Sequence, residues 1–117
     1  MDLVFEVTTK SNSVYKLFST RDKKTVVLKS DSPAFRNIDF ILLGTIFITD
    51  RLSFVGVLYS NAVINKKGKI ENKYPDKEVF TIDMNTEQYT TEIEGIKIVN
   101  KKIFDKLCKT SKIKIKK

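Results

Sequence analysis

Apolar and polar residues alternate along much of this chain, which is the pattern of half-buried β-strands. Such alternation predicts strands over residues 2–9, 13–18 and 25–30. Asn and Ser side chains bond their own backbone and favour turns, so the segment Lys10–Ser13 predicts a hairpin between the first two strands.

Residues 32–43 fit two structures. Ser32 followed by Pro33 resembles the start of a helix, with Ser32 as its N-cap. However, the segment IDFILLGTIFIT is apolar on both faces and rich in β-branched residues, which is typical of a covered central strand. We favour a short turn at Ser32–Arg36 and then a long strand, and the helix remains the alternative.

Two glycines lie inside neighbouring apolar segments that a tight connection at Thr49–Arg51 separates. If residues 52–60 form the second strand of a hairpin, Gly44 and Gly56 lie at matching heights. Glycine inside a strand indicates a bulge, a sharp bend or a close backbone approach. We therefore expect the sheet to bend at this pair, and a ligand lying on the exposed backbone is the alternative.

The second half of the chain again alternates, with turn residues between the apolar segments. Lys-Lys-Gly-Lys at residues 66–69 predicts a hairpin turn, and Pro75 predicts a loop. A strand is expected over residues 78–84 and a turn at residues 85–88. Residues 89–99 fit either a tight pair of strands around Gly95 or one bulged strand.

The period changes near the C-terminal end. Ile103, Phe104, Leu107 and Cys108 form a helical stripe, and Asn100 is a suitable N-cap. The last residues, SKIKIKK, alternate once more, so we expect residues 112–116 to form an edge strand with Ile113 and Ile115 on one face. A disordered tail is the alternative.

About seven or eight short strands and one short C-terminal helix predict an all-β or β-rich α+β fold. Strands at this spacing are typical of a small antiparallel barrel or sandwich. The chain has 117 residues, 41% of them hydrophobic, and residues 1–117 are expected to form a single domain.

Cysteine content and hydropathy indicate a location. Cys108 is the only cysteine, so no disulfide within the chain is possible, and a reducing, cytoplasmic environment is expected. No signal peptide is recognisable at the N-terminus. The charge-free run Phe40–Thr49 has ten residues, whereas a membrane-spanning helix needs about 20, so no membrane association is expected.

The residue types present exclude many catalytic sites. With no histidine and one cysteine, the usual triads and most transition-metal sites are ruled out, so we predict no catalytic residue, metal or cofactor. Glu92 and Glu94 share a strand face, but we expect them to be solvated and balanced by lysines such as Lys97. Cys108 is expected to be a buried structural residue, because it lies in the apolar stripe.

The positive charge is concentrated at one end of the chain. The basic C-terminal segment, residues 101–117, contains eight Lys and one Asp and so carries +7, which leaves +1 of the total +8 for residues 1–100. Lysines bind phosphates without sequence preference. The candidate nucleic-acid-binding residues are Lys101, Lys102, Lys106, Lys109, Lys112, Lys114, Lys116 and Lys117, joined by Lys66, Lys67 and Lys69 of the predicted hairpin turn.

These observations favour a non-enzymatic binding protein that contacts nucleic acid or another polyanion through the basic C-terminal segment. Tyr74 and Tyr89 are candidates for base stacking, because they lie in polar surroundings. The alternative is a protein-interaction module, a small inhibitor or accessory factor that binds an acidic protein through an apolar β surface. In that case the lysines serve solubility or steering.

Overall fold

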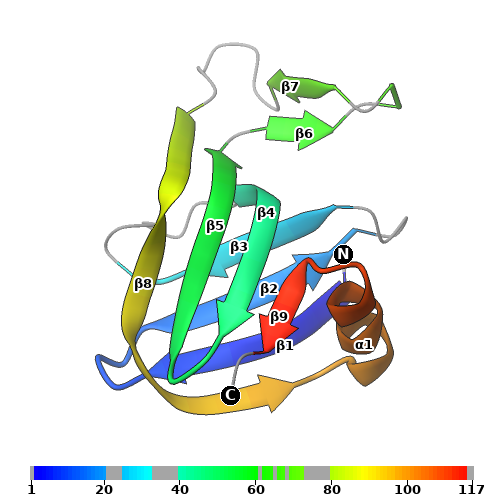
Figure 1. Cartoon of the computed structure of the whole chain (residues 1–117). Helices are drawn as coiled ribbons and strands as arrows, with labels where there is room; N and C mark the ends of the chain where they lie inside the picture. Colours follow the sequence, from blue (N-terminus) through cyan, green and yellow to red (C-terminus); the bar gives the residue numbers. More distant parts are fainter. Residues whose placement is uncertain are drawn as a thin grey trace.

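Strands make up most of the part of the chain that the structure describes, and this part contains one helix (Figure 1). The computed structural model describes residues 2–20, 25–32, 40–60, 62–64, 66–67, 69–72 and 80–115. Its elements are β1 (Asp2–Thr9), β2 (Val14–Ser19), β3 (Val26–Ser30), β4 (Phe40–Ile48), β5 (Arg51–Ser60), β6 (Ala62–Ile64), β7 (Ile70–Asn72), β8 (Phe80–Ile98), α1 (Lys101–Lys109) and β9 (Ile113–Ile115).

Six antiparallel strands close into a barrel in the order β3-β2-β1-β8-β5-β4, and pairing of β3 with β4 completes the ring. β9 is a seventh strand, which runs parallel to β4 along the part that β3 leaves free. β6 and β7 form a separate hairpin at the top of Figure 1. The predicted small antiparallel fold with a C-terminal helix is therefore confirmed, and of the two expected architectures, barrel and sandwich, it is the barrel.

The favoured strand is confirmed from Phe40 onward, because β4 begins there and pairs with β5 along its whole length. The predicted turn at Ser32–Arg36 lies largely outside the described residues, as does the loop at Pro75. The hairpin turn predicted at residues 66–69 joins two short antiparallel strands, β6 and β7.

The barrel interior is filled with aliphatic and aromatic side chains from the alternating positions of the strands. α1 closes one end, where the ring of Phe104 packs edge-on against that of Phe5, with centroids 5.7 Å apart. The largest fully buried side chains are Phe5, Phe40, Phe54, Leu17, Leu28, Ile46, Leu52 and Ile113.

The two glycines predicted to match are directly paired, Gly44 on β4 with Gly56 on β5. A Cβ atom on Gly44 would lie 2.8 Å from the Cα of Gly56, and one on Gly56 would lie 2.7 Å from the Cα of Gly44. Gly56 also has φ +132°, which residues with side chains rarely adopt. The strands thus approach each other here as only glycine allows.

The predicted turn at residues 85–88 is wrong, because β8 continues through it as one strand of 19 residues. The strand register explains the error. Gly56 pairs with Met84 and Phe54 pairs with Gln88, so β8 advances by four residues over a stretch in which β5 advances by two. The turn-forming residues are accommodated as a bulge.

A second bulge lies near Gly95, where Thr8 pairs with Gly95 and Thr9 with Ile93. Of the two structures expected for residues 89–99, the single bulged strand is therefore correct.

Candidate nucleic-acid interface

α1 is held at its N-terminus by the predicted cap. The Oδ1 atom of Asn100 accepts a hydrogen bond of 3.1 Å from the backbone N–H of Ile103. Capping of this kind satisfies a backbone donor that has no partner within the helix. Ile103, Phe104 and Leu107 face the barrel and are buried, so the remaining side of the helix faces solvent.

A tight turn leads from α1 directly into β9. The N–H of Lys112 donates to the carbonyl of Leu107 at 3.0 Å, and the N–H of Ile46 donates to the carbonyl of Lys112 at 2.9 Å. The Thr45 hydroxyl adds a 3.0 Å bond to the carbonyl of Ser111. The edge strand expected over residues 112–116 is therefore present at Ile113–Ile115, and Lys116 lies outside the described residues.

The two isoleucines of β9 differ in environment. Ile113 lies beside Ile46 and is 1% exposed, whereas Ile115 lies beside Ile48 and is 57% exposed. The alternation predicts that both residues share one face of the strand, and of the two only Ile113 is buried. Ile113 anchors the strand, because burying an aliphatic side chain is strongly favourable.

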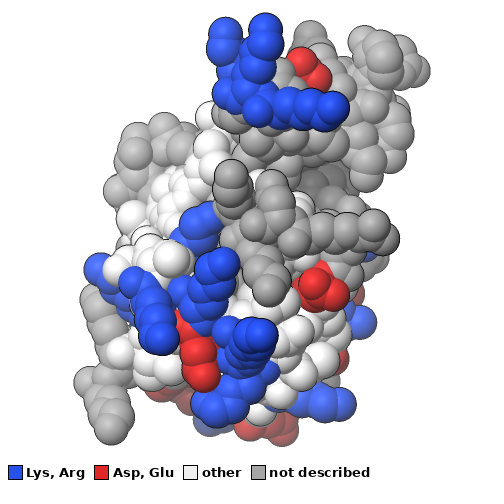
Figure 2. All heavy atoms as spheres, turned by 90° about the vertical axis from the view of Figure 1, so that its right-hand side faces the viewer, with Lys and Arg blue, Asp and Glu red and all other residues white. Residues whose placement is uncertain are grey.

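The lysines of this helix and strand form what we call the α1–β9 lysine surface. It comprises Lys101, Lys102, Lys106 and Lys109 on α1, and Lys112 and Lys114 on or beside β9. All are exposed except Lys112, which is half-buried. Figure 2 shows Lys and Arg side chains gathered at the height of α1 and β9. Lys117, like Lys116, is not among the described residues.

Few interactions occupy this surface. Asp105 is the only acidic residue of residues 101–115, and it lies 3.5 Å from the ammonium of Lys101. Exposed pairs of this kind contribute little. The Nζ atom of Lys114 lies 5.9 Å from the centre of the Phe47 ring on the neighbouring strand. No ion pair joins Lys102, Lys106 or Lys109 to another described residue.

The hairpin lysines occupy a different place. Lys66, Lys67 and Lys69 are exposed at the β6–β7 hairpin, close to Glu71 in the sequence. In Figure 2 this basic group lies at the top, and the α1–β9 lysine surface lies in the lower half. In this view the blue atoms of the two groups do not touch each other.

The aromatic candidates for stacking remain predictions. Tyr74 lies outside the described residues, and the structure describes only the backbone of Tyr89, which is part of β8. Tyr15 is buried, with its ring 6.2 Å from that of Phe54, so it belongs to the core.

Strand register creates a basic row that the sequence pattern did not reveal. Lys29 pairs with Lys16, Lys16 with Glu6, and Glu6 with Lys97 across four neighbouring strands. Residues directly opposite each other in a sheet share a face. This row lies on the outside of the barrel, and only a knowledge of which strands pair would have predicted it.

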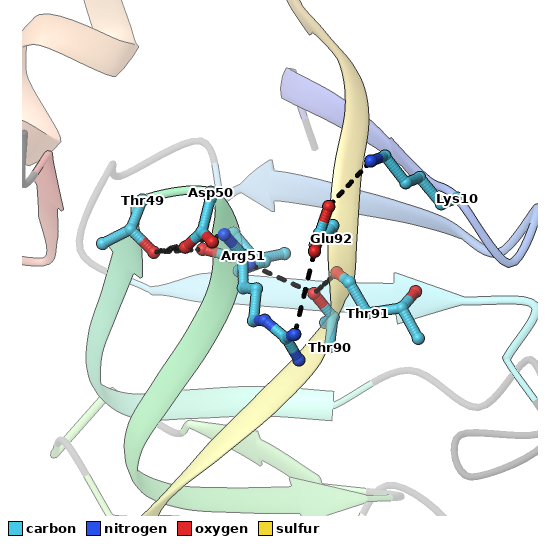
Figure 3. A network of polar contacts seen from close by, with 8 residues as sticks. Lys10, Thr49, Asp50, Arg51, Thr90, Thr91 and Glu92 are labelled. Carbon is cyan, nitrogen blue, oxygen red and sulfur yellow. Dashed lines mark hydrogen bonds and ion pairs between the residues drawn. The ribbon is translucent and has the colours of Figure 1, made fainter.

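The sequence predicts that lysines such as Lys97 balance the charge of Glu92 and Glu94. Lys97 is the wrong partner, because it lies opposite Glu6. Glu92 instead pairs with Lys10 at 2.7 Å and with Arg51 at 4.0 Å (Figure 3). The hydrogen bond from Lys10 lowers the pKa of Glu92, and Glu92 raises the pKa of Lys10. This exposed cluster joins the hairpin turns of the barrel.

Neighbouring hydrogen bonds reinforce that junction. The N–H of Leu52 donates to the Thr90 hydroxyl at 3.1 Å, and the N–H of Ile93 donates to the carbonyl of Asp50 at 2.7 Å. These bonds hold the β4–β5 turn against β8, close to the Glu92 cluster (Figure 3). The cluster therefore has a structural role in connecting strands.

Cys108 is half-buried and packs against the barrel core. Burial raises the pKa of its thiol, and the nearby Asp105 carboxylate acts in the same direction. A thiol that stays protonated is a weak nucleophile. These surroundings agree with the structural role expected for Cys108.

Neither metal-ligand groupings nor known relatives give a further guide to function. Within the described part of the chain, no three His, Cys, Asp or Glu side chains are grouped as metal ligands would be. Nor is any described helix long and apolar enough to cross a membrane. Comparison with protein-family models, curated proteins and solved structures finds no match to this chain.

Proposed function

We propose that this protein binds nucleic acid without sequence preference, through the α1–β9 lysine surface. The observation that carries the proposal is that six lysines and only one acidic residue lie on a folded helix–turn–strand unit docked on the barrel. A folded surface loses less conformational entropy on binding than a mobile tail does.

The spacing of the lysines fits a row of phosphates. Lys102, Lys106 and Lys109 follow one side of α1, with axial separations of about 4.5 to 6 Å. Lys112 and Lys114 lie on one face of the segment that leads into β9, and residues two apart in a strand are separated by about 6.7 Å. Each lysine that binds a phosphate releases condensed counterions, so binding is expected to weaken steeply as salt rises.

The stacking candidates and the hairpin lysines have a secondary role in this proposal. Tyr74 and Tyr89 would favour single strands, in which bases are free to stack. Lys66, Lys67 and Lys69 would extend the binding surface to a longer polymer. A reducing, cytoplasmic location is also part of the proposal, supported by the single cysteine.

The test is fluorescence anisotropy of the full chain with a labelled 20-nucleotide oligomer, single-stranded and duplex, over a series of salt concentrations. A variant with Lys102→Gln, Lys106→Gln and Lys109→Gln should bind more weakly. Its slope of log affinity against log salt should decrease by about 3, because three phosphates are no longer neutralised by lysine.

A matched control removes the same three charges elsewhere, by Lys16→Gln, Lys29→Gln and Lys97→Gln. This control should retain most of the affinity and slope. No binding at low salt, or equal losses in the two triple variants, would show that the α1–β9 lysine surface is not the binding site. Circular dichroism of both variants verifies folding.

A further inference from the structure

The last residues of β8 form an open edge, which we call the β8 edge (residues 94–98). Pairing of β5 with β8 ends at Arg51 and Glu92, whereas pairing of β1 with β8 continues to Ile98. Among the described residues, no strand pairs with the β8 edge on the side away from β1. An open strand edge is a template for another strand.

The hydrogen bonds to β1 show which backbone groups point outward. The N–H of Val99 donates to the carbonyl of Val4 at 2.9 Å. In an antiparallel ladder, bonded and non-bonded pairs alternate. Ile98 and Ile96 therefore occupy non-bonded pairs with Phe5 and Val7. Their N–H and C=O groups point away from β1, toward the open side.

The side chains beside this edge are apolar and exposed. Ile96 and Ile98 lie opposite the buried residues Val7 and Phe5 and so share the inner face of the sheet, yet they are 44% and 42% exposed. Val99 is 47% exposed on the other face. Three exposed aliphatic residues within four positions, next to unpaired backbone groups, are typical of strand addition.

We propose that the β8 edge binds an extended segment of a partner protein as an added strand. The segment would have apolar residues at alternate positions, facing Ile96 and Ile98, and acidic residues between them. Charge indicates the acidic positions, because Lys97 is exposed on the other face, between Ile96 and Ile98. This inference goes beyond nucleic-acid binding and uses different residues.

A second copy of this chain fits the same edge less well. An antiparallel pair around a two-fold axis must place residues of the same sheet face opposite each other. Two copies joined in this way would bring their Lys97 side chains to the same face of the extended sheet, and two chains of charge +8 repel each other.

The test follows amide hydrogen exchange in the isotope-labelled full chain by NMR. The probe is a capped eight-residue peptide that alternates Ile and Glu. Exchange at Ile96 and Ile98 should slow about 10-fold or more when the peptide binds, since these amides become hydrogen-bonded. A peptide of the same charge, with proline in place of every Ile, should leave these two amides unchanged.

A variant separates strand addition from charge attraction. Ile96→Pro removes an outward N–H without removing a hydrogen bond to β1, and proline is tolerated at sheet edges. It should lose peptide binding, whereas Ile96→Val should retain it. The triple variant at Lys102, Lys106 and Lys109 should also retain it, so failure here and failure of nucleic-acid binding are distinguishable.

The outcomes distinguish an acidic partner segment from a second copy of this chain at the β8 edge. Absence of slowing at Ile96 and Ile98 in the unaltered chain overturns the proposal, even if Ile96→Pro does not fold. Peptide binding that survives in a folded Ile96→Pro variant also overturns it. Protection that rises with protein concentration in the absence of peptide assigns the β8 edge to a second copy and overturns the acidic partner.

Discussion

Removing the side chain of Ile113 should destabilise the protein much more than removing that of Ile115. Ile113 is 1% exposed and lies among Ile46, Phe104 and Leu107 in the barrel core, whereas Ile115 is 57% exposed. Truncating a buried isoleucine to alanine costs about 2–5 kcal/mol, because it removes apolar packing and leaves a cavity. For Ile115→Ala we expect less than about 1 kcal/mol.

These costs convert into melting temperatures. A chain of 117 residues has an unfolding entropy of about 0.25 kcal/mol/K, so each kcal/mol shifts Tm by about 4 °C. Ile113→Ala should therefore lower Tm by about 8–20 °C, and Ile115→Ala by less than about 4 °C. Thermal unfolding followed by circular dichroism measures both, and urea titrations show whether the m-value is unchanged.

The two variants act as controls for each other, since they make the same chemical change two residues apart in one strand. Equal and small shifts would mean that residues 113–115 do not pair with β4 and behave as a tail. Equal and large shifts would mean that both side chains are buried, contrary to the structure. Either result would contradict the conclusion that β9 buries Ile113 and exposes Ile115.

Three further predictions concern other parts of the fold. Gly56→Ala should lower the free energy of unfolding by about 1–3 kcal/mol in a urea titration, because φ is positive and β4 lies too close for a Cβ. An unchanged urea midpoint would contradict the close contact between β4 and β5 at this residue. Asn100→Ala should cost about 1 kcal/mol and Asn100→Asp much less, as the cap requires an acceptor; equal losses would argue against the cap. In an NMR titration, Glu92 should have a pKa below its ordinary value of 4.5. Lys10→Met should raise that pKa, and no change would exclude the ion pair. Since the folded pKa is the lower one, the stabilisation is present above about pH 4.5 and is lost as pH falls through the folded pKa.

Local patterns predicted most of the strands, because a strand with one face on a core alternates in sequence wherever it pairs. The cap at Asn100 and the stripe of Ile103, Phe104 and Leu107 likewise predicted α1 from neighbouring residues. Residues 85–88 misled the prediction, since Asn85 favours turns and a polar segment that it begins also suits a bulge. Only the partner strand β5 distinguishes these two structures.

Features that depend on distant pairing were beyond the sequence pattern. Lys10 and Glu92 are 82 residues apart, so nothing local indicates their ion pair. The parallel pairing of β9 with β4 and the open β8 edge follow from how the barrel closes. For the candidate site, the sequence located the charge in residues 101–117, and the structure adds that α1 and β9 hold the lysines of residues 101–114 on the barrel.

The pairing of β1 with β8 has a consequence for how the protein is made. Phe5 pairs with Ile98, 93 residues later, so β1 is synthesised long before its partner β8 and the ring cannot close until β8 is made. At about 5–20 residues per second, translation takes roughly 5–20 s to span that interval. During this time β2 is the only one of its two neighbouring strands with which β1 can pair. Barrel closure is therefore a late event, governed by the arrival of β8.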